Sequence, residues 1–590
     1  MRSMLSGNVN PSLVDLKHLT HLDLSGNDFQ GIRIPKYLGS LKNLRYLNLS
    51  GAEFAGIIPH QLGNLSNLRC LDLSWSEYAL QVHSFSWLSG LSLLEHLDLS
   101  QMNLNKASDC WVFGPRHLVI MDLSYNQFEG QIPNRLGNLT SLRHLDLSAN
   151  KFNSTTPGWL SKFNHLEFLS VSSNGLQGPI PTSFVRLCEL TSIDVSDVKL
   201  SQDLSQVLDI LSACGASALE SLVFSSSQIS GHLTSQLGQF KSLRTLSLDD
   251  NCISGPLPPA FGDLSSLTRL DLSRNMLNGS IPLSLGKISH LEYLDLSNNK
   301  MNGTLSEIHF VNLTKLTWFS ASGNSLILQV NPNWVPPFQL KTLLLMSCHL
   351  GPQFPSWLHS QNNLSVLDIS NARISDTIPR WFWNSIFQYE YLNISSNQIY
   401  DVANNSLSGT MPGCVNNFSA MATIDSSHQS NAMSYFEVTA YDYEVLEDAS
   451  IVMKGSMVEY NSILNLVRII DVSKNNFSGE IPMELTYLRG LQSLNLSHNI
   501  FTGQIPENIG NLISIESLDF STNQLSSKIP QSMSSLSFLN HLNVSNNLLT
   551  GKIPSSTQLQ SFDASCFVGN NLCGPPLPSY QSWLPWVVIN

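Results

Sequence analysis

The stretch Leu264–Ile288 reads LSSLTRLDLSRNMLNGSIPLSLGKI and decides the fold. Its frame is L-x-x-L-x-x-L-x-L-x-x-N-x-L-x-G-x-I-P-x-x-L-G-x-I, and it returns one unit later, since Leu270 is followed 24 residues on by Leu294. Self-similarity at a fixed period of roughly 20–50 residues is the signature of a solenoid. The L-x-L alternation predicts a short strand with its leucines inward, and G-x-I-P then carries the chain across a flank.

The frame recurs along almost the whole chain. The first apolar residue of each L-x-L pair is found at Leu22, Leu47, Leu71, Leu97, Met121, Leu145, Leu169, Ile193, Leu222, Leu246, Leu270, Leu294, Phe319, Leu343, Leu367, Leu392, Ile470, Leu494, Leu518 and Leu542. This is the frame of a leucine-rich repeat, and its Gly-x-Ile-Pro half resembles the plant extracellular subtype. We therefore predict an α/β leucine-rich-repeat solenoid, a curved right-handed superhelix of plant-type 24-residue repeats with a parallel sheet on its concave side.

Asparagine and aspartate occupy fixed places in the frame. The Asn of L-x-L-x-x-N is expected to be buried, with its amide bonded to the backbone of adjacent turns. Asp recurs between the two leucines, at Asp23, Asp72, Asp98, Asp122, Asp146, Asp271, Asp295, Asp368 and Asp471. We expect this column to be exposed and to have an architectural role.

The composition and the motifs exclude several classes of function. Charged residues make up only 13% of the chain and the net charge is −13, which argues against a nucleic-acid-binding surface. The sequence contains no G-x-S-x-G, P-loop, H-E-x-x-H or kinase signature, and no close Cys/His cluster typical of zinc. We expect no enzyme, no catalytic residue, no metal site and no cofactor.

The two ends carry no readable targeting signal. No charged segment leads into an apolar core after Met1, and no run of about 18 or more apolar residues occurs. We therefore expect neither a signal peptide nor a membrane helix within this chain.

The regular spacing fails in two places. The step from Ile193 to Leu222 is longer than the others, and a short helix is expected around Val207–Leu211. A fused or partly deleted repeat is expected at 392–410, and a long segment without the frame follows it. The predicted organisation is a repeat array at 1–413, an island insertion at 414–466, further repeats at 467–554, a cap at 555–577 and a tail at 578–590.

Four stretches together resemble one family. These are Leu5–Phe29, Leu38–Arg69, Val452–Pro482 (VMKGSMVEYNSILNLVRIIDVSKNNFSGEIP) and Ser561–Leu577 (SFDASCFVGNNLCGPPL). They resemble plant leucine-rich-repeat receptor-like proteins, particularly the group that includes the receptors for fungal ethylene-inducing xylanase. Such proteins begin with a signal peptide and a Cys-rich cap and end with a membrane helix and a short tail, so the chain looks truncated at both ends.

The resemblance implies a function and partners. It implies the ectodomain of a cell-surface immune receptor at the plasma membrane, with its repeats outside the cell. Such an ectodomain binds a protein or peptide elicitor and signals through partner receptor kinases. Two alternatives remain open: a soluble cell-wall inhibitor of microbial polysaccharide-degrading enzymes, and a nonfunctional truncated product. Repeat number and the insertion argue against the inhibitor, which has about ten repeats.

Candidate ligand-binding residues lie in two places. The residue before each L-x-L core is expected to project from the concave sheet, where polar-tipped aromatics favour recognition. These candidates are Tyr46, His96, His144, Phe168, Tyr293, Trp318 and Tyr391. In related receptors the island contacts ligand and co-receptor, which adds Tyr441, Tyr443, Lys454 and Tyr460.

Covalent modification is expected at asparagines and cysteines. N-x-S/T motifs, which the repeat consensus itself creates, predict glycans at Asn48, Asn64, Asn138, Asn153, Asn278, Asn302, Asn312, Asn363, Asn393, Asn404, Asn417, Asn476, Asn495 and Asn543. The resemblance implies a disulfide between Cys188 and Cys214, which bracket the long unit. A second disulfide is expected between Cys566 and Cys573, where the cap seals the edge of the core.

Overall fold

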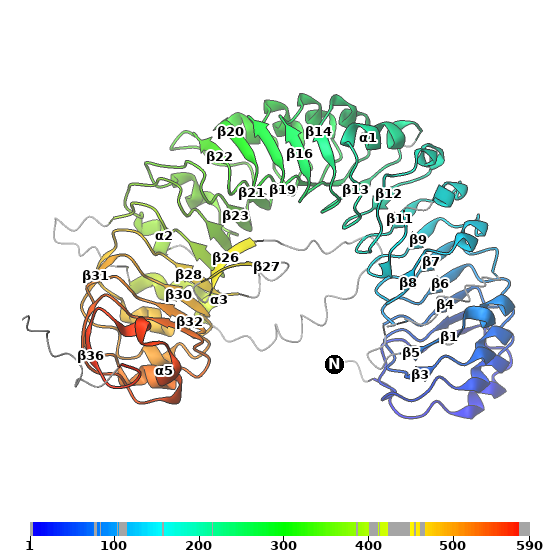
Figure 1. Ribbon diagram of the computed structural model, residues 1–590, viewed down its shortest axis with the longest axis horizontal. Coiled ribbons are helices and arrows are strands. Elements are labelled where there is room, and N and C mark those ends of the chain that lie inside the picture. The colour runs from blue at the N-terminus through cyan, green and yellow to red at the C-terminus, as the bar shows by residue number, and fades with distance from the viewer. Residues whose placement is uncertain are drawn as a thin grey trace, which may run out of the picture. The chain divides into compact units, whose positions relative to one another are not determined.

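The structure of the protein is a computed structural model (Figure 1). It describes residues 4–75, 80–82, 84–102, 104, 115–155, 158–214, 216–384, 388–400, 411, 413–422, 449–453, 456–460 and 467–577. The chain divides into two compact units, Met1–Leu291 and Glu292–Asn590. Each unit is a stack of similar turns.

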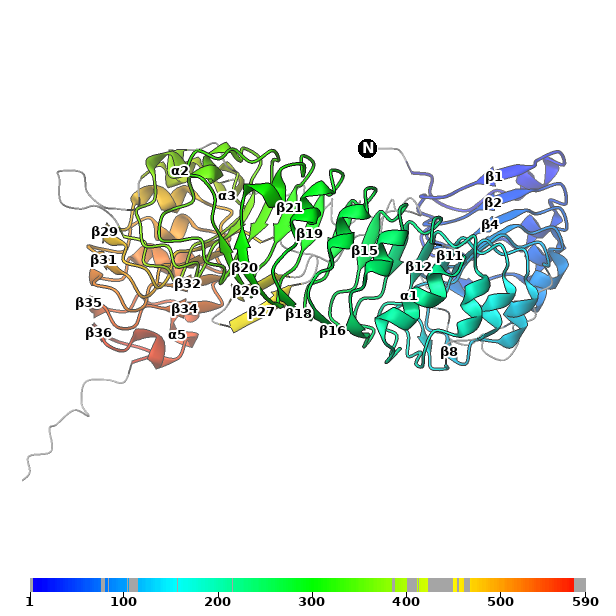
Figure 2. The ribbon, with the colours of Figure 1, turned by 90° about the horizontal axis from the view of Figure 1, so that it is seen from above.

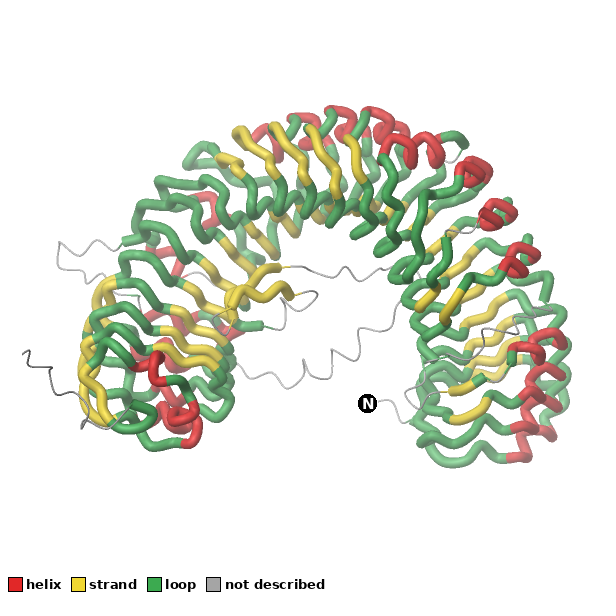
Figure 3. The backbone as a smooth tube through the Cα atoms, in the orientation of Figure 1, coloured by secondary structure: helices red, strands yellow, loops and turns green. Residues whose placement is uncertain are grey.

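Short parallel strands, one per repeat, form the inner wall of each unit (Figure 3). In the first unit they are β1 (His21–Asp23), β2 (Tyr46–Asn48), β4 (Cys70–Asp72), β6 (His96–Asp98), β7 (Ile120–Asp122), β9 (His144–Asp146), β11 (Phe168–Ser170), β12 (Ser192–Asp194), β13 (Ser221–Val223), β15 (Thr245–Ser247) and β17 (Arg269–Asp271). In the second they are β19 (Tyr293–Asp295), β21 (Trp318–Ser320), β23 (Thr342–Leu344), β24 (Val366–Asp368), β25 (Tyr391–Asn393), β28 (Ile469–Asp471), β30 (Ser493–Asn495), β32 (Ser517–Asp519) and β34 (His541–Asn543). Equivalent positions pair in register, as Leu246 does with Leu270. The predicted α/β leucine-rich-repeat solenoid is confirmed.

The flank of each repeat is built by its G-x-I-P segment. Flanking strands are β3 (Gly56–Ile57), β5 (Leu80–Gln81), β8 (Glu129–Gly130), β10 (Lys151–Phe152), β14 (Ser230–His232), β16 (Cys252–Gly255), β18 (Met276–Gly279), β20 (Lys300–Leu305), β22 (Ser325–Leu328), β29 (Ser478–Glu480), β31 (Ile500–Thr502), β33 (Ser526–Ser527), β35 (Leu548–Lys552) and β36 (Asn571–Cys573). Gly279 has φ +73°, a conformation that side chains disfavour. Pro282 then begins the outer turn with an extended backbone.

Helical turns form the outer wall (Figure 3). The 3-10 turns are η1 (Pro11–Asp15), η2 (Lys36–Ser40), η3 (His60–Asn64), η4 (Phe85–Gly90), η5 (Asn134–Asn138), η6 (Gly158–Lys162), η7 (Thr182–Arg186), η8 (Ser235–Gln239), η9 (Pro259–Asp263), η10 (Leu283–Lys287), η11 (Glu307–Phe310), η12 (Ser356–Ser360), η13 (Gly413–Asn417), η15 (Met483–Tyr487), η16 (Ile509–Asn511), η17 (Gln531–Ser535) and η18 (Ala564–Phe567). The α-helices are α1 (Leu204–Ser212), α2 (Arg380–Asn384), α3 (Ser419–Ala422) and α5 (Thr557–Ser561).

The core is a seam of leucines closed by the predicted ladder of buried asparagines. Asn275 shows the pattern, because its Nδ2 donates to the carbonyl of Leu248 in the preceding repeat at 2.8 Å. Its Oδ1 accepts from the backbone N–H of Ile253 at 2.9 Å. One amide therefore satisfies buried backbone groups of two turns, which links each repeat to the one before it.

The long repeat contains the helix that its sequence predicts. α1 has Asp203 as its N-cap, with the side chain accepting from the N–H of Ser205. It packs between η7 and η8 on the outer wall (Figure 2). The disulfide expected beside it is present, since Cys188 and Cys214 are bonded with their Cα atoms 5.1 Å apart.

The second break in the frame is bridged directly by the sheet. β25 pairs in parallel with β28, although 75 residues separate Asn393 from Ile469. η13 and α3 complete the outer wall of the same repeat, where Phe418 contacts the ring of Tyr389. Residues 414–422 of the predicted island 414–466 thus lie in elements of the outer wall.

Within the insertion the structure describes one hairpin. β26 (Ala449–Met453) and β27 (Ser456–Tyr460) pair antiparallel and lie on the side of the inner strands (Figure 1). Elsewhere, no helix in the described part of the chain is long and apolar enough to cross a membrane.

Candidate binding surfaces on the inner wall and the flank

The inner wall of the first unit carries the predicted row of histidine and aromatic side chains. The rings of His144 and Phe168 stack with centroids 4.0 Å apart and an interplanar angle of 4°, because β9 and β11 place them side by side. Tyr46, His96 and His144 are half-buried in this row, whereas Phe168, predicted to project from the sheet, is only 8% exposed and is therefore a core residue. Burial lowers the pKa of His96 and, with His96 nearby, lowers that of His144 to about 4. The imidazole of His144 is therefore neutral above about pH 4.

Beside this row lies a column of four consecutive carboxylates, Asp72, Asp98, Asp122 and Asp146, on β4, β6, β7 and β9. Each accepts a hydrogen bond from the N–H of the serine two residues on, as Asp98 does from Ser100 at 2.9 Å. This is an Asx turn that ends the strand. The column thus has the architectural role expected of it.

The expected exposure of the aspartates is wrong. Only the first of the column, Asp23, is exposed, whereas Asp271, Asp368 and other members are buried. Burial, with the neighbouring carboxylates, raises the pKa of Asp98 and of Asp122 to about 7. The error arises because adjacent strands of the ladder lie about 4.8 Å apart, so each carboxylate is covered by its neighbours.

The same row in the second unit is closed at Trp318 and Tyr391, whereas Tyr293 is half-buried. Trp318 and Tyr391, predicted to project from the sheet, are only 7% and 3% exposed. They belong to an apolar cluster with Leu344, Val366, Val467 and Ile469, against which Tyr293 packs. Tyr293 and Trp318 stack with ring centroids 5.2 Å apart. Large side chains on successive strands bury one another, so Trp318 and Tyr391 are core residues rather than an open binding surface.

The acidic column of the second unit alternates with asparagine. Along β24, β25, β28, β30, β32 and β34 the sequence is Asp368, Asn393, Asp471, Asn495, Asp519 and Asn543. Each amide donates to the carboxylate before it, with Nδ2 to Oδ2 distances of 2.9, 3.0 and 3.5 Å. The hydroxyl of Tyr391 also donates to Asp368 at 3.0 Å. No two carboxylates are adjacent in this stretch.

These asparagines are also predicted glycan acceptors, and the structure separates them from the others. Asn393 is 8% exposed and donates to both Asp368 and Tyr391, so the expected glycan there does not fit. Asn48, Asn495 and Asn543 are half-buried in equivalent strand positions. The acceptors on the flanks and outer wall are exposed, namely Asn64, Asn138, Asn153, Asn278, Asn302, Asn312, Asn363 and Asn476. Asn404 and the side chain of Asn417 lie outside the described residues.

Two further predictions can be placed. Cys566 and Cys573 are free thiols, so the expected cap disulfide is not formed. Cys566 lies against the end of β34, where its carbonyl accepts from Val544 N–H, whereas Cys573 lies in β36 on the flank. In the insertion, Tyr441, Tyr443, Lys454 and the side chain of Tyr460 lie outside the described residues, so these four remain predictions.

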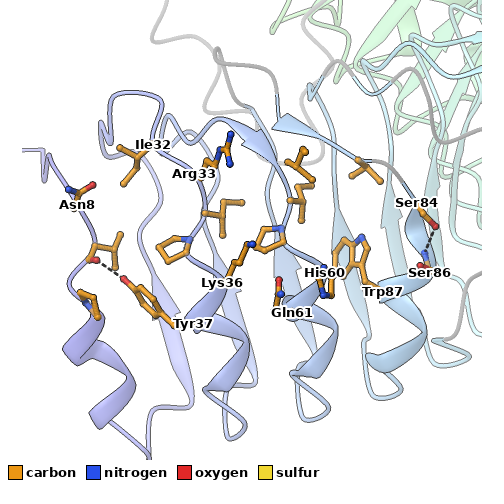
Figure 4. Close-up of a pocket in the computed structure, with 18 residues that line it drawn as sticks. Asn8, Ile32, Arg33, Lys36, Tyr37, His60, Gln61, Ser84, Ser86 and Trp87 are labelled. Carbon is orange, nitrogen blue, oxygen red and sulfur yellow. Dashed lines mark hydrogen bonds between the residues drawn. The ribbon is translucent and has the colours of Figure 1, made fainter.

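A pocket of about 770 Å³ lies on the flank of the first four repeats, not on the inner wall (Figure 4). The Ile–Pro edges of consecutive repeats line it, together with Arg33, Lys36, His60, Gln61 and Trp87. Sequence reasoning missed it because these residues fall at unremarkable positions of three different repeats. Across the described residues, no group of three or more His, Cys, Asp and Glu side chains is placed to hold a metal ion.

Comparison with known proteins defines the class of protein. Models described as leucine-rich repeat match residues 92–152, 140–200 and 217–277, and six further segments from 43–65 to 538–560, as well as 15–31. Together these matches cover more than half of the chain, which therefore belongs to the leucine-rich-repeat family.

Relatives found by sequence indicate which kind of leucine-rich-repeat protein the chain is. Receptor-like protein EIX1 of Solanum lycopersicum is 44% identical over 125 residues, which cover 18% of this chain and 12% of that protein. Receptor-like protein EIX2 of the same plant is 36% identical over 180 residues, covering 30% and 17%. The matched regions thus span less than a fifth of either relative. Within its family, the chain is a plant leucine-rich-repeat receptor-like protein.

Solved structures agree with this assignment. The chain resembles the ectodomain of the Arabidopsis receptor kinase HAESA bound to an N-terminally extended IDA peptide hormone, with a TM-score of 0.60 and 26% identity. That match covers 98% of this chain and 90% of the other. HAESA in complex with IDA and the co-receptor SERK1 gives a TM-score of 0.57 at 28% identity, with 97% and 81% covered.

Proposed function

We propose that this chain is the repeat part of a receptor ectodomain that binds a proteinaceous elicitor on the inner wall of its first unit. The observation that carries the proposal is the contrast between the two inner walls. The row through Tyr46, His96 and His144 is half-buried and offers polar-tipped rings, whereas the equivalent row at Trp318 and Tyr391 is closed. Amphipathic rings held rigidly on a sheet suit protein recognition, because little entropy is lost on binding.

Charged pairs border this row. Arg69 pairs with Glu95, and Arg143 pairs with Glu167, each pair joining neighbouring repeats at the entrance to their strands. These pairs are half-exposed, so their contribution to stability is small. They set the polar rim that a protein ligand would meet around the rings.

Signalling is proposed to pass to partner receptor kinases at the plasma membrane. The support is by resemblance: relatives are receptor-like proteins, and the HAESA structure contains a peptide hormone and the co-receptor SERK1. A chain of this family acts by binding and not by catalysis. The insertion, with Tyr441, Tyr443, Lys454 and Tyr460, is proposed as a second contact for ligand or co-receptor.

Binding by a secreted form of the chain tests the proposal. A fungal ethylene-inducing xylanase serves as the probe, and affinity is measured by biolayer interferometry. Combined His96→Ala and His144→Ala substitution is expected to weaken binding at least tenfold. His117→Ala, which changes an exposed histidine outside the row, is the matched control. Equal affinity of the double variant and the control would place the site elsewhere.

Deletion of the insertion separates its role from that of the sheet. Removing residues 423–466 leaves η13 and α3 in the outer wall, so the repeat that they complete is kept. Loss of affinity on deletion would support the second contact, and unchanged affinity would remove it from the proposal. A separate measurement of xylanase activity in the presence of the chain distinguishes the inhibitor alternative, because an inhibitor lowers that activity whereas a receptor only binds.

A further inference from the structure

The pocket on the flank of the first unit, here called the flank groove, has the features of a second binding site. Its lining is largely apolar, because the Ile–Pro edges of consecutive repeats contribute to it, among them Ile34 and Pro35 and then Ile58 and Pro59. Ile57 beside them is 44% exposed. Figure 4 shows these edges following one another along the groove.

The rim of the flank groove is basic in a chain that is acidic overall. Arg33, Lys36 and His60 are exposed and line it, and among the residues that the structure describes no aspartate or glutamate does so. Among the described residues, none of these three side chains forms an ion pair. With a net charge of −13 for the whole chain, this local excess of positive charge favours an acidic ligand.

Two polar atoms of lining residues are left without a partner among the described residues. The indole N–H of Trp87 and the side-chain oxygen of Gln61 are buried and make no hydrogen bond to any residue that the structure describes. Both residues line the groove, and Trp87 itself is only 8% exposed. A buried donor and a buried acceptor in adjacent repeats match the C=O and N–H that a peptide backbone presents.

We propose that the flank groove binds an extended peptide segment in which acidic residues alternate with apolar ones. Repeats stack about 4.8 Å apart, so a groove across four repeats accommodates about four or five extended residues at roughly 3.3 Å each. Side chains of an extended peptide alternate between faces, which directs apolar groups to Ile57 and Ile58 and carboxylates to Arg33 and Lys36.

A peptide fits the flank groove better than an acidic oligosaccharide does. An oligosaccharide has no apolar side chains to cover the Ile–Pro floor. The ring of Trp87 is buried and presents an N–H, not an open face on which a sugar ring could stack. This site is independent of the inner-wall row, so failure of either proposal leaves the other standing.

Selection from a random heptapeptide phage library against the full chain tests the proposal. Arg33→Glu combined with Lys36→Glu reverses the charge of the rim at exposed positions, and Lys151→Glu, on an exposed flank position outside the groove, is the control. Peptides that bind the parent chain are expected to carry alternating acidic and apolar residues. The Kd of a synthetic copy is expected to rise at least tenfold with the double variant and to stay within twofold with the control.

Trp87→Phe provides the second variant, since it keeps the buried ring and removes only the N–H. It is expected to weaken the selected peptide about threefold to tenfold without changing the circular dichroism spectrum. Selected peptides without acidic residues, or equal binding to parent and double variant, would overturn the proposal. Binding of a tetrameric galacturonate in place of the peptide, with the same loss in the double variant, would overturn the ligand class.

Discussion

The inner walls of the two units are built on the same repeat frame but differ in how their buried carboxylates are arranged. In the first unit four consecutive strands place Asp72, Asp98, Asp122 and Asp146 in one uninterrupted stack. In the second unit every carboxylate from β24 to β34 is separated from the next by an asparagine that donates to it. Burial raises the pKa of the carboxylates in both walls, among them Asp98 and Asp122 in the first and Asp368 and Asp471 in the second. In the first wall adjacent carboxylates add to this effect, whereas in the second wall the donating amides oppose it.

The rows of ring side chains beside these columns also differ, in how deeply the rings are buried. Around the aspartate stack, Tyr46 and His96 stay half-buried and accessible, whereas around the alternating column Trp318 and Tyr391 are closed into a cluster. The leucines fix the turn of each repeat, whereas the residues on either side of the first leucine determine whether that part of the wall is an open surface or part of the core.

Replacing the largest residue of the closed row is expected to have the greatest effect. Trp318→Ala removes a buried ring from the cluster with Val366 and Tyr391, and should lower the free energy of unfolding by about 3–5 kcal/mol. Tyr46→Ala, at the equivalent half-buried position of the first unit, should cost about 1 kcal/mol or less. Urea unfolding followed by circular dichroism measures both. Similar losses would show that the two rows are not different.

Converting the alternating column into a continuous one tests its electrostatics. Asn393→Asp places a carboxylate between Asp368 and Asp471 and removes the donor to Asp368, so stability at pH 7.5 should fall by about 3 kcal/mol. The loss should shrink at pH 4, where the new carboxyl group is protonated. Asn495→Asp, at a half-buried position, is the matched control and should cost less. An unchanged unfolding midpoint for Asn393→Asp would contradict the assigned role of the amide.

The reverse change in the first unit should stabilise. Asp122→Asn interrupts the stack between Asp98 and Asp146 and keeps an oxygen to accept from Ser124 N–H. Burial raises the pKa of Asp122 to about 7, and one pKa unit corresponds to about 1.4 kcal/mol. Because the side chain is partly exposed, the electrostatic effect is reduced. We expect the free energy of unfolding to rise by about 1–2 kcal/mol at pH 7.5 and to be unchanged at pH 4. A destabilised Asp122→Asn variant at pH 7.5 would refute the repulsion.

The smallest change concerns glycans and needs no substitution. Because Asn393 is buried and bonded to Asp368 while Asn64 and Asn138 are exposed, a secreted chain should carry glycans at Asn64 and Asn138 and none at Asn393. Glycopeptide mass spectrometry reads the occupancy of each acceptor directly. Full occupancy of Asn393 would mean that the closed wall opens before or during secretion.

Sequence spacing predicted the solenoid, the asparagine ladder and α1, because each depends on contacts within one repeat or with its neighbour, and the family resemblance implied the Cys188–Cys214 disulfide. Spacing failed at Phe168, Trp318 and Tyr391, because their burial depends on the side chains that several successive strands present together. The predicted exposure of the aspartate column was wrong for the same reason, since the stacking of identical residues covers Asp98 and Asp122. The flank groove was not predicted because its lining comes from four consecutive repeats, and the pattern of a single repeat does not show which residues of different repeats lie together.

Hydrogen-exchange mass spectrometry at several pH values, corrected for intrinsic exchange rates, tests the central contrast most directly. The pKa of Asp98 and of Asp122 is raised in the folded state, so the stabilisation is complete below about pH 4 and is lost as the pH rises through about 7. Peptides from β6 to β9 are therefore expected to lose protection between pH 5 and pH 7.5, and peptides from β28 to β34 to lose less. Equal loss of protection in both regions, or rising protection in β6 to β9, would contradict the proposed difference between the two carboxylate columns.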